Sequence, residues 1–236
     1  MVLDGIQVIL TASIVTLAVL AAIAGIVVLE SFFRSKLKEL FSDISYFIFF
    51  FLVCGYILYS IGEVSFYLET VVLKDTSNLG IADVYWTGGA SFIMISFLAL
   101  AVMLFKQHYD SAKLTKMLVI GGGLMAVVVF LLFGVTLGEE AHFFSYFYPL
   151  ASSLIVAFAI SVVLFSSQLG QLSIPLKFFL LASSGILLGD ILFTYINTQG
   201  IYGTIGMLAD IFYLFGYGTS FVAFVLWKIR VHHQTA

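Results

Sequence analysis

The chain has 236 residues and a formal net charge of −3, and 62% of its residues are hydrophobic while only 10% are charged. Soluble proteins contain roughly 45–50% apolar and about 25% charged residues, so this composition excludes an ordinary soluble domain. The mean hydropathy of +1.15 and the presence of only 2 prolines favour long helices that satisfy their own backbone hydrogen bonds in lipid.

Seven segments are apolar and long enough to cross a bilayer, whose hydrocarbon core takes about 20 helical residues. In chain order they cover about 6–29, 44–66, 82–105, 116–137, 143–167, 176–197 and 205–228. The first segment follows Asp4 and lacks the basic region of a cleavable signal peptide, so we interpret it as a membrane span. Because the connections are short, the sequence predicts an all-α membrane protein, with one seven-transmembrane-helix bundle over residues 1–236.

Two of these helices contain residues that alter helix packing. Gly121, Gly122 and Gly123 lie in the fourth helix, where small residues allow close contact with a neighbouring helix. Pro149 lies in the fifth helix and is expected to kink it, because proline removes one helical hydrogen bond.

The basic residues predict the orientation of the bundle. In a chain with seven spans, the connections after the first, third and fifth helices share a side with the C-terminus. The basic residues on that side are Arg34, Lys36, Lys38, Lys106, Lys113, Lys116, Lys177, Lys228 and Arg230. Only Lys74 falls on the other side, so the positive-inside rule places the N-terminus outside and the C-terminus in the cytoplasm. We expect this membrane to be the cell (plasma) membrane.

The second and third helices resemble the sixth and seventh in sequence. At a constant offset of 127 residues, Glu63, Phe66, Ala82, Asp83, Trp86 and Gly89 align with Asp190, Phe193, Ala209, Asp210, Tyr213 and Gly216. The two pairs lie four helices apart, so both cross the membrane in the same direction. The sequence therefore predicts a parallel internal repeat joined by a linking fourth helix, which is a known membrane architecture.

Acidic residues gather in the outer half of the predicted bundle, where almost no basic residue can pair with them. The acids there are Glu63, Glu69, Asp75, Asp83, Glu139, Glu140, Asp190 and Asp210, and His142 follows Glu140 closely. Acids inside a membrane are costly, so they usually face a polar cavity and carry function. Asp83 and Asp210 stand at the starts of their predicted helices, where capping and the helix dipole offer a structural explanation.

Glu63 and Asp190 have no such explanation, because both lie near the C-terminal ends of their helices, where the dipole disfavours an acid. Asp190 lies 13 residues after Lys177. That spacing is roughly 20 Å along a helix, which is inside a hydrocarbon core about 30 Å thick. An ionised carboxylate there must be paired, protonated or bound to a cation. The structural alternative is a hydrogen bond to a tyrosine or serine of another helix.

No motif in the sequence predicts an enzyme, a cofactor or nucleic-acid binding. His142 is the only histidine expected outside, so neither a haem ligand pair nor a zinc site of the usual composition is indicated. The acids suit an all-oxygen site for a hard cation better, and the presence of a metal stays open. The outer aromatic residues, including Tyr195 and Tyr213, fit an interfacial belt or, alternatively, a pocket wall that faces an organic cation.

The last two helices carry a resemblance to a known class of protein. The residues that carry it are Gly189, Asp190, Phe193, Tyr195, Ala209, Asp210, Tyr213, Gly216 and Tyr217. Their spacing resembles the membrane sensor modules that precede kinase or diguanylate cyclase domains in bacterial signalling proteins. Only a short tail follows Lys228, so a signalling role would need a separate partner. The layout also resembles microbial rhodopsins, but no lysine lies between Asp210 and Trp227 to bind retinal.

These observations favour a receptor-like or sensor-like membrane protein with an outward pocket for a small cation or a cationic ligand. The expected ligand-binding residues are Glu63, Asp83, Asp190, Asp210, His142, Tyr195 and Tyr213. Two alternatives stay open: a cation- or proton-coupled transporter, and a non-catalytic structural subunit of a larger membrane complex. The expected partners are the lipid bilayer, the cationic ligand and a signalling or complex partner.

Overall fold

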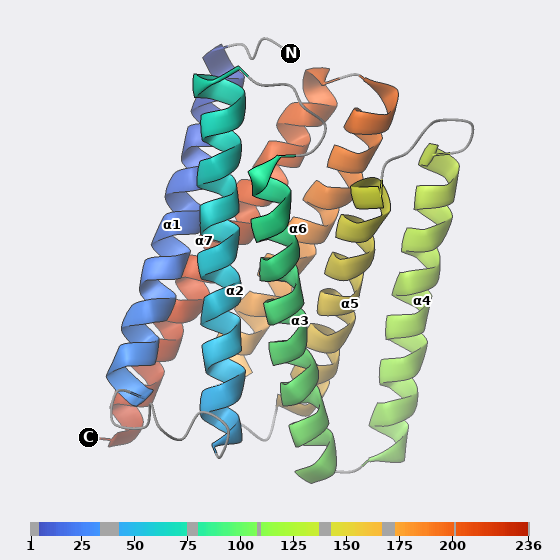
Figure 1. Ribbon diagram of the computed structural model, residues 1–236. Helices are drawn as coiled ribbons and strands as arrows, with labels where there is room; N and C mark the ends of the chain where they lie inside the picture. The colour runs from blue at the N-terminus through green and yellow to red at the C-terminus, as the bar shows by residue number, and fades with distance from the viewer. Residues whose placement is uncertain are drawn as a thin grey trace.

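The computed structural model describes residues 5–33, 43–74, 80–107, 110–136, 143–166, 173–200 and 202–235 (Figure 1). This part of the chain contains seven α-helices: α1 (Gly5–Phe33), α2 (Ile44–Tyr67), α3 (Ile81–Gln107), α4 (Ser111–Thr136), α5 (Phe143–Phe165), α6 (Ser173–Gln199) and α7 (Gly203–Thr235). Each contains a stretch that is long and apolar enough to cross a membrane. The prediction of an all-α bundle with seven membrane-length helices is therefore confirmed. A π-helical turn, Leu68–Val72, extends α2 and was not predicted.

Aspartates fix the starts of two helices at the same end of the bundle. At the start of α2, Asp43 Oδ1 accepts the backbone N–H groups of Ser45 and Tyr46 at 2.9 and 3.2 Å. At the start of α4, Asp110 Oδ1 accepts the N–H groups of Ala112 and Lys113 at 2.9 and 3.3 Å. These caps satisfy backbone donors that have no partner within the first helical turn.

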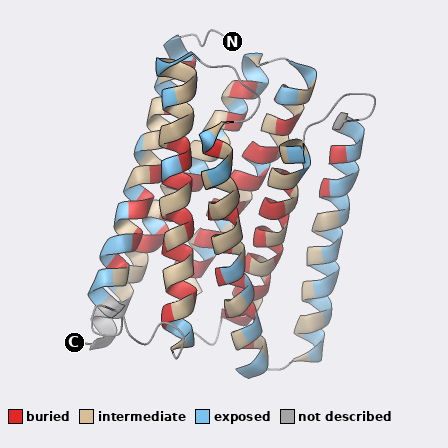
Figure 2. Cartoon of the chain, viewed as in Figure 1, coloured by how far each residue is buried: buried red, intermediate tan, exposed pale blue. Residues whose placement is uncertain are grey.

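Six helices form a closed ring, and α4 lies outside it. Around the ring, α1 packs against α2, α2 against α3, α3 against α5, α5 against α6, α6 against α7, and α7 against α1. α4 packs mainly against α5 and stands at the edge of the bundle (Figure 1). Most of its surface is exposed in Figure 2, so a large part of this helix would face lipid.

Glycines bring two pairs of helices into close contact, and of the three glycines expected to do so in α4 only Gly121 lies against a neighbouring helix, since a methyl group there would be 3.4 Å from Ala157 Cβ of α5. A methyl group on Gly55 of α2 would lie 3.0 Å from the carbonyl oxygen of Gly89 in α3. A methyl group on Gly216 of α7 would lie 3.2 Å from the carbonyl oxygen of Ala182 in α6. In contrast, Gly122 and its neighbour Gly123 have no atom within 4 Å of such a group. The expectation that these two glycines allow close helix contact is wrong, because they face away from the other described helices.

Pro149 lies inside α5 and leaves one carbonyl without its helical partner. Proline has no backbone N–H, so the carbonyl four residues earlier, that of Ser145, loses its usual donor. Thr194 Oγ1 of α6 donates to this oxygen at 3.0 Å. A side chain of a neighbouring helix thus replaces the missing bond, which is how helices tolerate proline in lipid, and it ties α5 to α6 one turn after Asp190.

Replacing Ser96 with alanine should lower the free energy of unfolding by about 0.5–1.5 kcal/mol, the range for a hydrogen bond between membrane helices. Ser96 is buried in α3, and its Oγ donates to the carbonyl oxygen of Ile48 in α2 at 2.8 Å. Chemical or thermal unfolding in detergent would measure the change. The control is Ser91→Ala, because Ser91 Oγ donates within α3 to Thr87 O at 2.8 Å. Equal losses from both variants would contradict a special role for the bond between the helices.

Candidate functional site

A cavity lies inside the six-helix ring. Every ring helix contributes to its lining and α4 does not: the residues are Thr11, Ile14, Tyr59, Glu63, Phe66, Trp86, Tyr148, Ile186, Asp190, Phe193, Tyr202, Asp210, Tyr213 and Tyr217. The volume open to the centres of water molecules is ≈ 80 Å³. One water needs about 10–15 Å³ by this measure, so the cavity has room for several waters or a small organic molecule.

Two buried carboxylates enter the cavity from opposite sides of the ring. Glu63 of α2 is 7% exposed, and its Oε1 accepts a hydrogen bond of 2.7 Å from the Tyr217 hydroxyl of α7. Asp190 of α6 is 8% exposed, and its Oδ1 accepts a bond of 2.8 Å from the Tyr213 hydroxyl of α7. Its Oδ2 accepts from the Ser152 hydroxyl of α5. These bonds fix both carboxylates and leave part of each facing the cavity.

A third carboxylate completes the acidic part of the lining. Asp210 of α7 accepts a hydrogen bond from the Tyr202 hydroxyl, and both residues line the cavity. Asp210 is the eighth residue of α7, which begins at Gly203. The dipole acts over the first turn only, so the expectation that Asp210 stands at a helix start and is stabilised by capping is wrong. Asp210 therefore differs from Asp83, its counterpart in the sequence repeat, which does lie in the first turn of its helix.

Asp83 does stand at a helix start, where its side chain caps the helix. Its Oδ2 accepts the backbone N–H of Gly80 at 3.0 Å, as an acid in the first turn of a capped helix does. Its Oδ1 accepts a hydrogen bond of 2.6 Å from the Tyr148 hydroxyl. Asp83 is absent from the cavity lining, but it holds Tyr148, which belongs to it.

No lysine, arginine or histidine occurs among the described residues that line the cavity. Glu63 is close enough to Asp190 and Asp210 for their charges to interact. Like charges in a low-dielectric interior repel strongly, and each ionised group also loses its hydration. The three carboxylates therefore need protons or an external cation, since the lining supplies only neutral hydrogen-bond donors.

Aromatic rings form most of the remaining wall. The Trp86 ring lies 5.4 Å from that of Phe66 and 6.1 Å from that of Tyr148, both measured between centroids. The rings of Tyr59 and Tyr217, which also line the cavity, are 6.3 Å apart and nearly perpendicular. The Trp86 Nε1 atom is buried, and no acceptor among the described residues has the distance and angle of a hydrogen bond to it. The Glu63 carboxylate, which interacts with this indole, is an acceptor available to it.

Four of the seven residues expected from the sequence line the cavity. They are Glu63, Asp190, Asp210 and Tyr213. Asp83 and Tyr195 are absent from the lining, and His142 lies outside the described residues. The binding role of all seven stays a prediction.

Several lining residues were not among those expected. Tyr59 lies four residues before Glu63 on α2, so helical periodicity places both on one face and gives the signal that was overlooked. Ser152 is not part of this lining but is the partner of Asp190, and it has no such local signal, because it comes from another helix. The same is true of Thr11 and Ile14 of α1, which meet the cavity only because the ring closes between α1 and α7.

Among the described residues, no group of three or more His, Cys, Asp or Glu side chains is arranged to hold a metal ion. No protein-family model, curated protein or solved structure matches the chain. The function must therefore be argued from the cavity itself.

Proposed function

We propose that the chain is a receptor-like or sensor-like membrane protein whose central cavity binds a small organic cation. The observation that carries this proposal is the meeting of three carboxylates with aromatic walls and with no basic side chain in the described lining. In a site of this kind, a cation supplies the charge that the protein itself does not.

The chemistry of the wall favours an organic cation over a metal ion. A metal needs several ligands that converge on one point, and no such group is present among the described residues. An ammonium group instead benefits from carboxylates on one side and aromatic faces on the other. The rings of Trp86, Tyr148 and Tyr59 offer such faces beside Glu63 and Asp190. The cavity volume of ≈ 80 Å³ suits a ligand of only a few heavy atoms.

The direction of the site follows from the distribution of charge. Glu63 lies in the last third of α2 and Asp190 lies two thirds of the way along α6, away from Lys177 in the first turns of α6. Lys106, Lys228 and Arg230 lie near the ends of α3 and α7, and by the positive-inside rule these ends face the cytoplasm. The cavity then opens toward the outside, as a receptor for an external ligand requires.

The proposed parallel repeat explains why two carboxylates meet in one cavity. It is supported by equivalent contacts 127 residues apart: Gly62 packs against Trp86 as Gly189 packs against Tyr213. The packing of α1 against α7 and of α5 against α3 also supports an extension of this repeat to triplets of helices. Under this relation Glu63 and Asp190 occupy equivalent places in the two triplets.

Asp190→Asn should weaken the binding of an organic cation at least 10-fold, because it removes one of the charges while keeping a side chain of the same shape. The measurement is the thermal unfolding of the detergent-purified protein with tetramethylammonium, choline, a primary amine, Mg²⁺ and Ca²⁺. A ligand at about 100 times its Kd adds about 2.7 kcal/mol of stability to the folded state. The variant should lose most of the rise in Tm that a selective cation gives to the original protein.

The matched control is Asp43→Asn, which makes the same chemical change at the far end of α2. Asparagine caps a helix about as well as aspartate, so this variant should keep both its fold and the full ligand response. A response of the Asp190→Asn variant equal to that of the original protein would rule out the proposed role of Asp190. A flat response of the original protein to every cation would favour a structural subunit of a larger complex.

A cation- or proton-coupled transporter is the second candidate, and one observation favours it. A smaller cavity with serine and tyrosine hydroxyls lies beside the main one, lined by Tyr56, Ser152 and Ser183 among others. Polar groups thus continue past Asp190, although a transporter needs a route across the whole bilayer. Uptake of the selected cation into proteoliposomes under a pH gradient would support this candidate, and absence of uptake with intact binding would support the receptor.

A further inference from the structure

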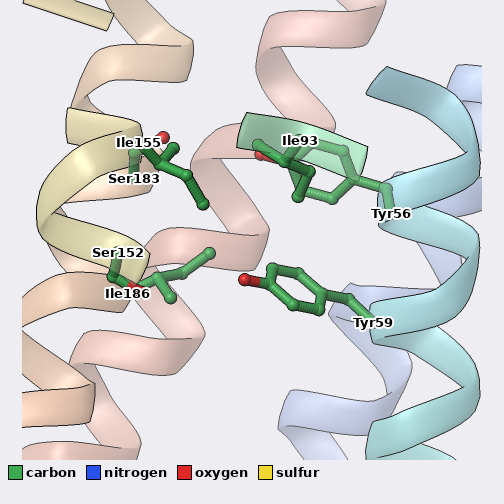
Figure 3. A pocket seen from close by; sticks show the side chains of 7 residues that line it. All are labelled: Tyr56, Tyr59, Ile93, Ser152, Ile155, Ser183 and Ile186. Atoms are coloured by element: carbon green, nitrogen blue, oxygen red, sulfur yellow. The ribbon is translucent and has the colours of Figure 1, made fainter. Parts of the chain in front are cut away.

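The smaller cavity lies between four helices of the ring. Figure 3 shows its seven lining side chains, which come from α2, α3, α5 and α6: Tyr56, Tyr59, Ile93, Ser152, Ile155, Ser183 and Ile186. Tyr59 and Ile186 also line the main cavity, so the two spaces adjoin. The volume open to water centres is ≈ 10 Å³, which is about the amount that a single water requires.

Two hydroxyl groups in this small cavity have no hydrogen-bond partner among the described residues. Tyr59 is 6% exposed, and its hydroxyl points across the space toward Ile186 and Ser152 in Figure 3. Ser183 is 4% exposed and lines the same space. A buried hydroxyl without a partner destabilises the folded protein, so buried polar groups are almost always satisfied by protein or by ordered water.

Two further hydroxyls line the space, and each has hydrogen-bonding capacity to spare. Ser152 Oγ donates to Asp190 Oδ2, and a serine oxygen that donates can still accept. Tyr56 Oη is hydrogen-bonded to Ser220 Oγ at 2.7 Å, and the tyrosine oxygen can still accept a further bond. Buried waters typically make two to four hydrogen bonds, so this set of groups is sufficient for one.

We propose that the small cavity is the site of one buried water molecule, held by the hydroxyls of Tyr59, Ser183 and Ser152. The water donates to Ser152 Oγ, which in turn donates to Asp190. A hydrogen-bonded chain then joins Tyr59 and Ser183 to a carboxylate of the main cavity. This assignment does not depend on what the main cavity binds.

Tyr59→Phe and Ser183→Ala provide the test, because each removes one group that holds the water. Each variant should lower the Tm in detergent by about 2–4 °C, the shift that about 1 kcal/mol produces in a protein of this size. The double variant should lower it by clearly less than the sum, since the water is already lost after the first change. Ser184→Ala is the matched control: Ser184 Oγ donates to Leu180 O within α6 at 2.9 Å, so its effect should add to that of Tyr59→Phe.

If the small cavity holds no water, the two substitutions should have a different effect on the Tm. Removing an unpaired buried hydroxyl would then leave the Tm unchanged or raise it, and the effects of the two variants would add. That result would overturn the proposal. An experimental structure that resolves ordered water gives a second test, because it should contain one oxygen within hydrogen-bond distance of both Tyr59 Oη and Ser183 Oγ. A well-ordered site without that oxygen would also overturn it.

Discussion

Replacing Gly89 with alanine should lower the free energy of unfolding by about 3 kcal/mol, at the upper end of the usual range for overpacking. The added methyl group would lie 2.5 Å from Tyr59 Cδ1 and 2.9 Å from the carbonyl oxygen of Gly55. Since the second contact is with backbone, α2 and α3 must move apart to relieve it. Equilibrium unfolding in detergent measures the loss. Because Tyr59 lines both cavities, cation binding should weaken as well.

The control for this prediction is Gly122→Ala in α4. A methyl group there has no atom within 4 Å, so nothing must move. Alanine is also the better helix former, by roughly 0.5–1 kcal/mol, so this variant should be neutral or slightly more stable. Similar losses from both substitutions would show that helix propensity, and not the contact between α2 and α3, decides the stability.

Tyr217→Phe should lower the free energy of unfolding by about 2–3 kcal/mol. The hydroxyl of Tyr217 donates to the buried Glu63 carboxyl group at 2.7 Å, and a buried acceptor that loses its donor costs about 1–3 kcal/mol. Phenylalanine keeps the ring, which packs against that of Tyr59, and removes only the donor. The measurement is equilibrium unfolding at neutral pH.

Tyr146→Phe is the corresponding control, because Tyr146 is 38% exposed on the first turn of α5. Its hydroxyl is not part of the cavity, so its removal should change the stability by less than about 0.5 kcal/mol. If the two variants lose the same amount, the hydrogen bond to Glu63 contributes nothing specific. Added organic cation should offset part of the loss in Tyr217→Phe, because a bound cation also satisfies the carboxylate.

Hydropathy was sufficient to predict the seven helices, because a span must hide its backbone and its length follows from the thickness of the bilayer. The position of Glu63 and Asp190 at a polar cavity was also predictable, since the energetic penalty of an acid in lipid depends little on its neighbours. Asp210 was harder to interpret. Its role depended on where α7 begins, and helix boundaries are the least certain part of such a prediction.

Contacts between distant helices could not be predicted in the same way. The tyrosine partners of Glu63 and Asp190 come from α7, 154 and 23 residues away along the chain, and hydropathy contains no information about which helices meet. The glycine run in α4 is a second example of contacts that the sequence could not predict. Small residues permit close contact but do not specify a partner, and in this helix Gly122 and Gly123 meet none of the described residues.

The position of α4 outside the ring has a consequence for how such a protein can arise by gene duplication. A unit with three spans enters the membrane on one face and leaves on the other, so a second copy joined directly would be inverted. One extra crossing restores the original direction. In the proposed repeat, α4 supplies this crossing, and only then can Glu63 and Asp190 reach one cavity from two parallel copies. Selection on α4 would then act mainly on its length and apolar character, so its sequence should drift faster than that of the ring.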